Sequence, residues 1–262
     1  MAHTYLEDKI TKNSFETGIQ TLIDAKNLFT VQNTLQGVPG DLIVKNIYTF
    51  SGNVVDADTG LAVDEADRGK LTYTTEEKRI KAYKFAYDIT DKEKRQNGDI
   101  IPFCANGASE VVWNKINDDY YAELAKITKT SNYTGSLTWD NVEDALGTLG
   151  LEDYNDLYLL VSPKDYSTLK KSMKGIATDN SNIVFKGQMM MVDGLAIVRS
   201  NKLTDGTSFI ARKDTIVNEV KMDADVQVDV YAELEKETYV IKFAGLVYLA
   251  SEKYAIKLVK TA

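Results

Sequence analysis

The sequence contains few of the residues that enzymes most often use for chemistry. Among 262 residues there are one histidine, one cysteine and three prolines. The histidine, His3, lies near the amino terminus, which argues against a Ser-His-Asp triad. Cys104 cannot form an internal disulfide, and we expect a buried structural thiol rather than a nucleophile. P-loop, GxGxxG, HExxH and GxSxG motifs are missing too, so we predict no catalytic, cofactor-binding or metal site.

Long apolar runs are also missing. No window approaches the roughly 18 consecutive apolar residues of a membrane-spanning helix. The first residues, MAHTYLEDKITKNSF, lack the apolar core of a signal peptide. A single cysteine fits a protein made in a reducing cytoplasm. We therefore expect no membrane partner, and we interpret the glycosylation sequon at 132–134 as a chance match.

The chain has fewer basic than acidic residues. The chain has 39 acidic and 31 basic residues, which give a formal net charge of −8. Proteins that bind nucleic acid gain most of their non-specific affinity from Lys and Arg contacts with phosphates. The charge balance therefore argues against tight, direct binding of DNA.

Two acidic clusters could suggest general acid and base groups or cation sites. Asp118 and Asp119 are adjacent on an expected helix, where neighbouring side chains point about 100° apart. Asp64, Glu65 and Asp67 lack the ligand spacing of an EF-hand loop. We favour solvated surface residues in both clusters.

Two segments predict a long two-stranded hairpin. Residues 41–60, DLIVKNIYTFSGNVVDADTG, suggest a strand followed by an acidic, glycine-bearing tip, and residues 70–90 return with alternating apolar side chains. The alternating positions of the returning segment are Ile80, Tyr83, Phe85, Tyr87 and Ile89. Because a hairpin alone is marginally stable in water, we expect it to lie against another surface.

Residues 106–127, NGASEVVWNKINDDYYAELAKI, predict an amphipathic helix. Its apolar positions follow one another at steps of four, four, four and three. They are Val112, Ile116, Tyr120, Leu124 and Ile127. Asn106 or Ser109 is expected to cap the start of this helix.

The segment from Trp139 to Ser172 carries several local signals that agree. Residues 139–149 predict a short helix closed by Gly150. Residues 157–161, LYLLV, predict a strand buried on both faces. Ser162 then caps a second helix, with Pro163 at its first position.

The last third of the chain predicts mostly β-structure. In GQMMMVDGLAIVRSNKL (187–203), two short apolar strands flank Asp193 and Gly194, a pair that favours a tight type I′ turn. The three consecutive methionines at 189–191 are interpreted as pliable core or interface filler rather than a metal site.

The order of these elements resembles that of the major capsid proteins of tailed bacteriophages, which share the Hong Kong 97 fold. The stretch FKGQMMMVDGLAIVRSNKL (185–203) is similar to a recurring family segment in which two strands flank a turn glycine and are followed by Ser and Leu. The stretch VDVYAELEKETYVIKFAGLVYLASEKYAIKLVK (228–260) looks like the closing strands of the family.

The resemblance implies an α+β fold, the Hong Kong 97-type capsid fold, in five parts. The expected parts are an N-terminal arm (1–36), an extended β-hairpin called the E-loop (37–90), a P-domain with a long spine helix (91–134), a mixed A-domain (135–225), and C-terminal strands that return to the P-domain (226–262).

The resemblance also implies a structural, non-enzymatic function. Copies would assemble into pentamers and hexamers of an icosahedral phage head that encloses double-stranded DNA. The protein would belong to the virion and assemble in the host bacterial cytoplasm. Expected partners are further copies, a portal, packaged DNA held without tight specific binding, and a separate scaffolding protein unless the chain has already been processed. Some relatives crosslink through Lys, but no motif around Lys70 supports this.

Contacts with a neighbouring copy are expected on the apolar residues near the hairpin tip. These residues are Val54, Val55, Leu61, Val63, Leu71 and Tyr73.

Two other interpretations stay open. An encapsulin-like nanocompartment shell would share the fold and store an enzyme instead of DNA. A carboxylate-based hydrolase or carbohydrate-binding β-protein would use the many Asp, Glu and Tyr residues, and would be a monomer or dimer with a concave pocket.

Overall fold

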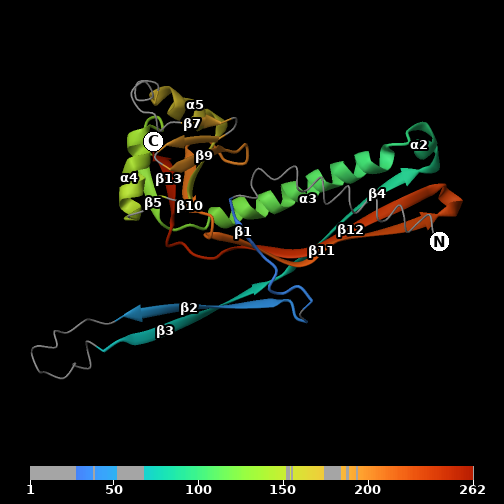
Figure 1. Ribbon diagram of the computed structural model, residues 1–262, viewed down its shortest axis with the longest axis horizontal. Helices are drawn as coiled ribbons and strands as arrows, with labels where there is room; N and C mark the ends of the chain where they lie inside the picture. Colours follow the sequence, from blue (N-terminus) through green and yellow to red (C-terminus); the bar gives the residue numbers. More distant parts are fainter. Residues whose placement is uncertain are drawn as a thin grey trace, which may run out of the picture. The chain divides into compact units, whose positions relative to one another are not determined.

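The computed structural model describes residues 28–37, 39–51, 68–151, 154, 156–173, 184–186, 189–192 and 194–261 (Figure 1). The chain divides into two compact units. We call residues 38–81 the arm unit, and residues 1–37 with 82–262 the body. None of the helices in the described ranges has the length and hydropathy to span a bilayer.

One half of the body is built on a seven-stranded mixed sheet. Its strands, in spatial order, are β5 (Thr130–Thr134), β13 (Ala255–Thr261), β10 (Thr207–Arg212), β6 (Leu157–Val161), β9 (Leu195–Arg199), β8 (Met189–Val192) and β7 (Val184–Lys186). The pairs β5–β13 and β6–β9 are parallel and the others are antiparallel.

The central strand β6 is buried on both of its faces. Leu159 packs with residues of α4 (Trp139–Leu149) and α5 (Pro163–Ser172) in one cluster. Tyr158 and Leu160 pack in another cluster, with residues of the long helix α3 (Ile100–Leu124). The predicted fully buried strand is confirmed.

Local signals placed α4 and α5 correctly. Gly150 ends α4 in the left-handed conformation, with φ of 70°. The Ser162 hydroxyl accepts a hydrogen bond from the Asp165 amide at 3.1 Å, which caps α5, and Pro163 follows at the first position.

The other half of the body is a four-stranded sheet covered by α3 (Figure 1). Its strands, in order, are β1 (Thr30–Gln32), β11 (Ile216–Tyr231), β12 (Lys236–Leu249) and β4 (Lys81–Thr90). The 3-10 turn η3 (Ala232–Leu234) joins β11 to β12, and the helix α2 (Asp91–Gln96) follows β4. Val112 of α3 packs against Val226, Tyr239 and Ile241 of the sheet.

The long helix starts earlier than expected. α3 begins at Ile100, its N-cap is Asp99, and no side chain caps it, so the predicted caps at Asn106 and Ser109 are wrong. Ser109 lies inside the helix and its hydroxyl donates to the Ala105 carbonyl at 2.8 Å. Pro102 lies in the first turn of the helix, where proline is tolerated.

The arm unit contains one antiparallel hairpin. β2 (Leu42–Ser51) and β3 (Lys70–Arg79) pair over all ten residues, from Leu42 opposite Arg79 to Ser51 opposite Lys70. The Ile80 amide donates to the Asp41 carbonyl at 2.9 Å and closes the base. These two strands form a sheet of their own.

The strands divide the chain differently from the expected segment boundaries. The segment 70–90 forms two strands on either side of Ile80. The first, β3, pairs with β2, and the second, β4, lies beside β12 in the four-stranded sheet. The hairpin expected at 37–90 is therefore shorter. β11 begins at Ile216, before the expected boundary at 226, and β13 joins the seven-stranded sheet rather than the sheet under α3.

Candidate assembly surfaces

One face of the arm hairpin carries exposed apolar side chains. Leu71 and Tyr73 lie two residues apart on β3, and Leu42 and Val44 are opposite Arg79 and Glu77 of the same alternating set. All four therefore lie on one face, which we call the arm face. Their exposed fractions range from 39% for Leu42 to 69% for Tyr73. The other predicted contacts, Val54, Val55, Leu61 and Val63, lie outside the described residues.

The opposite face of the hairpin carries mainly polar side chains, with Ile43 also on it. It includes Lys70, Thr72, Glu76 and Lys78, with Lys78 and Glu76 forming an ion pair at 3.3 Å. Exposed apolar side chains gathered on one face of a narrow hairpin are typical of a surface that binds a partner.

The body has a second group of exposed apolar residues where β11 turns into β12. Val230, Tyr231 and Leu234 are exposed there, with Leu234 at 63%. We call this group the body tip. The helix α2 is at the same end of the sheet, because the Asp91 amide donates to the Glu235 carbonyl at 2.8 Å.

The helix α3 adds a short exposed stripe. Phe103 and Val111 are eight residues apart on one face, and Gly107 lies between them with open space around its α-carbon. Phe103 is 74% exposed, which is unusual for a phenylalanine on a helix. The stripe is a further candidate for a contact.

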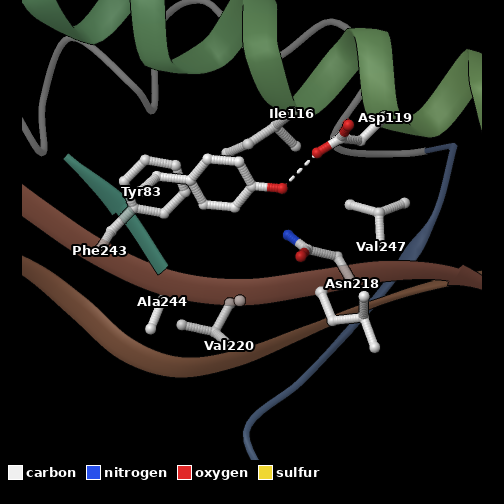
Figure 2. A pocket seen from close by; sticks show the side chains of 10 residues that line it. Tyr83, Ile116, Asp119, Asn218, Val220, Phe243, Ala244 and Val247 are labelled. Atoms are coloured by element: carbon white, nitrogen blue, oxygen red, sulfur yellow. Dashed lines mark hydrogen bonds between the residues drawn. The ribbon is translucent and has the colours of Figure 1, made fainter. Parts of the chain in front are cut away.

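A small cavity of about 40 Å³ lies in the body between α3, β4, β11 and β12 (Figure 2). Tyr83 donates a hydrogen bond to Asp119 across it, and its ring stacks on Phe243 with centroids 4.7 Å apart. Burial, followed by the bond to Asp119, raises the pKa of the Tyr83 hydroxyl. The tyrosine therefore stays protonated and acts as a donor.

The acidic pair at 118–119 has two different environments. Asp118 is exposed and pairs with Lys202 at 2.8 Å. Asp119 is not the solvated residue we expected, because it accepts from Tyr83 and pairs with Lys115 at 3.1 Å. Sequence analysis missed this contact, since Tyr83 lies 36 residues away.

Groups suited to catalysis or metal binding do not gather in the described ranges. No set of three or more His, Cys, Asp or Glu residues there could hold a metal ion. Cys104 is only partly buried, and burial, with Glu93 nearby, raises the pKa of its thiol. A raised pKa lowers the thiolate fraction and therefore the nucleophilicity.

The family follows from a comparison over most of the chain. A family model described as "Phage capsid protein" matches residues 73–253, which is more than half of the sequence. The chain belongs to the phage capsid protein family. As a family member it is a major capsid protein, a structural component of the phage particle.

Individual relatives agree with this assignment. The capsid protein is 26% identical over 241 residues to the major capsid protein of Staphylococcus phage phiMR11, covering 88% of this chain and 84% of the relative. Its fold is similar to the capsid of the cyanophage P-SCSP1u, with a TM-score of 0.67 and 14% identity over 89% of this chain and 86% of the other. The Hong Kong 97-type, α+β capsid fold is therefore confirmed.

The same fold occurs in an encapsulin. The SrpI encapsulin complex of Synechococcus elongatus PCC 7942 matches this capsid protein with a TM-score of 0.66 and 10% identity, covering 90% of this chain and 86% of the other. Identity this low shows a shared fold only.

In the capsid protein, residues 189–199 form a tight hairpin. β8 and β9 pair with Val192 opposite Leu195, which leaves a two-residue loop. Gly194 has a φ of 86°. Asp193 lies outside the described residues, so the type I′ assignment stays a prediction.

We expect Gly194→Val to destabilise the subunit by about 1–3 kcal/mol, because a β-branched residue at positive φ is strained. Urea unfolding of the unassembled subunit measures this cost. Gly194→Asn is the control, since asparagine tolerates positive φ. A valine variant as stable as the parent would show that the turn is assigned incorrectly.

Proposed function

We propose that this capsid protein acts only as a structural subunit, without enzymatic activity, and assembles into pentamers and hexamers of an icosahedral phage head around double-stranded DNA. The arm face carries this proposal. A two-stranded hairpin that exposes Leu42, Val44, Leu71 and Tyr73 gains stability when it lies against another surface.

Self-association explains the position of the exposed apolar residues. The arm face and the body tip are different surfaces, so a contact between them joins two copies head to tail. Such heterologous contacts close into rings when the rotation permits. Several contacts per copy would bury more than the roughly 1,200–2,000 Å² of one standard interface.

The family fold suggests how the proposed head is divided among the segments of the chain. We retain the expected parts as a proposal: residues 1–36 as N-terminal arm, 37–90 as E-loop, 91–134 as P-domain, 135–225 as A-domain and 226–262 as closing strands. The strand boundaries described above would move the E-loop limit to about residue 81.

The net charge of −8 suits a container for DNA. An acidic wall repels the duplex, so DNA moves past it without being gripped. A scaffolding protein and a portal are the other proposed partners, and the host bacterial cytoplasm is the proposed place of assembly.

A nanocompartment that stores an enzyme is the second candidate, favoured by the fold shared with the SrpI encapsulin. Neighbouring genes distinguish the two candidates. Terminase, portal and head-protease genes would support a phage head, whereas a ferritin-like or peroxidase gene would support a nanocompartment.

Deleting residues 54–69 tests the role of the arm tip. The deletion joins β2 to β3 through Gly52 and Asn53, a two-residue loop of a kind that hairpins tolerate. We expect a folded, soluble subunit that assembles poorly, measured by sedimentation and electron microscopy.

A full-length control separates loss of length from loss of apolar contacts. In it, serine replaces Val54, Val55, Leu61 and Val63. We expect this control to assemble poorly as well. Normal assembly of the deletion variant would remove the arm tip from the mechanism.

A further inference from the structure

The chain leaves the body for the arm unit after residue 37 and returns at Ala82. Each of these two points is held by a carboxylate of the body. The contacts that hold them lie within the body itself, and sequence analysis identified neither.

The outgoing segment, residues 28–36, is docked along the start of β11. β1 pairs in parallel with Val217–Glu219. The Leu28 and Phe29 side chains are buried, and the Leu28 carbonyl accepts a hydrogen bond from the Tyr158 hydroxyl at 2.6 Å. The segment is therefore bound firmly up to the last residues before the arm unit.

Glu219 holds the end of this segment. Its Oε1 accepts from the Thr34 hydroxyl at 2.5 Å and from the Leu35 amide at 3.1 Å. The Gln36 amide group also donates to Asp223, at 2.7 Å. Glu219 is only 1% exposed, and burying a carboxylate costs free energy unless it is hydrogen-bonded. A buried acid here therefore indicates a positional role rather than simple packing.

Asp119 holds the returning strand. Tyr83 is the second residue after the body resumes, and its hydroxyl donates to the Asp119 Oδ2 (Figure 2). Stacking on Phe243 fixes the ring, with an interplanar angle of 11°. Lys115 fixes the carboxylate from the other side, with its Nζ 3.1 Å from Oδ1.

Both holding sites involve the same part of β11, from opposite faces of the strand. Asn218 and Val220, which flank Glu219 in sequence, line the same small cavity as Tyr83 and Asp119 (Figure 2). Gly245 keeps β12 close to β11 at this level, because a β-carbon there would lie 3.0 Å from the Glu219 carbonyl oxygen.

We propose that Glu219 and Asp119 are positioning residues for shell assembly, which hold the body residues on each side of the arm unit, Thr34, Leu35 and Tyr83, in the same place in every copy. The inference rests on the proposed function. A closed shell needs equivalent contacts from each copy, and junctions that are ordered before assembly lower the entropy lost when the arm docks.

The double variant Thr34→Val/Tyr83→Phe tests this role. It removes one hydroxyl at each holding site and keeps the size of both side chains. We expect the subunit to stay folded, with a somewhat lower thermal midpoint, because both hydrogen bonds lie within the body. The yield of uniform closed shells should fall on the order of tenfold, because looser junctions increase the entropy lost when the arm docks.

The matched control is Thr148→Val/Tyr154→Phe. It removes one threonine hydroxyl and one tyrosine hydroxyl in the half of the body built on the seven-stranded sheet. There the Thr148 hydroxyl donates to the Asp144 carbonyl of its own helix. We expect this control to assemble like the parent. Glu219→Gln should retain most assembly, because its amide oxygen still accepts from Leu35.

Hydrogen exchange of the unassembled subunit provides a readout that does not depend on assembly. Amides of residues 30–36 and 82–84 should exchange faster in the double variant than in the parent, with those of β6 and β10 unchanged.

The outcomes separate the inference from the proposed function. Faster exchange with an unchanged yield of uniform shells would overturn the positioning role alone. A double variant that no longer folds would assign the two hydroxyls to folding and also overturn it. Failure of the parent protein to assemble would overturn the proposed function and this inference with it.

Discussion

Leu71→Asp is expected to abolish assembly at concentrations where the parent protein forms shells. Leu71 is 60% exposed on the arm face, so the unassembled subunit should fold normally. In a shell this face would be covered, and an unpaired carboxylate there would lose its hydration. We expect the concentration for half-maximal assembly to rise about 10- to 100-fold, or ~1.4–2.8 kcal/mol per contact. Light scattering over a dilution series measures it.

Thr72→Asp is the matched control for this prediction. Thr72 is the next residue of β3, is exposed, and lies on the opposite, mainly polar face of the hairpin. The control adds the same charge one residue away, so it corrects for a general effect of net charge. Equal loss of assembly in both variants would contradict a specific role of the arm face.

Phe29→Ala is expected to cause the largest loss of subunit stability, about 3–5 kcal/mol. The Phe29 ring is 2% exposed and contacts Trp113 and Tyr120, with centroids 6.2 Å and 5.7 Å away. Its removal leaves a cavity under α3 and loosens residues 28–36. Urea unfolding of the unassembled subunit measures the change.

Phe103→Ala makes the same chemical change at an exposed position of α3. It should alter the free energy of unfolding by no more than about 0.5 kcal/mol. If both alanine variants were equally stable, residues 28–36 would not be docked in the core as described.

Elements encoded by neighbouring residues were predictable. The helix from Trp139 closed by Gly150, the buried strand 157–161, and the helix capped by Ser162 each depend on signals within a few residues. The alternation on both sides of Ile80 also predicted strands correctly.

Features that depend on distant partners were not predictable. Alternation cannot show that β3 pairs with β2 while β4 lies beside β12, because both segments have the same period. The early start of α3 was missed, because the helix begins at Ile100 without a side-chain cap to mark it. The contacts of Asp119 with Tyr83 and of Glu219 with Thr34 join residues 36 and 185 positions apart, which no local pattern reveals.

The central claim is that the protein functions by assembling with copies of itself. Electron microscopy of the purified, concentrated chain, alone and with its candidate scaffolding protein, tests this claim most directly. We predict rings of five and six subunits and closed shells of uniform size. Only monomers or dimers under both conditions would contradict the account.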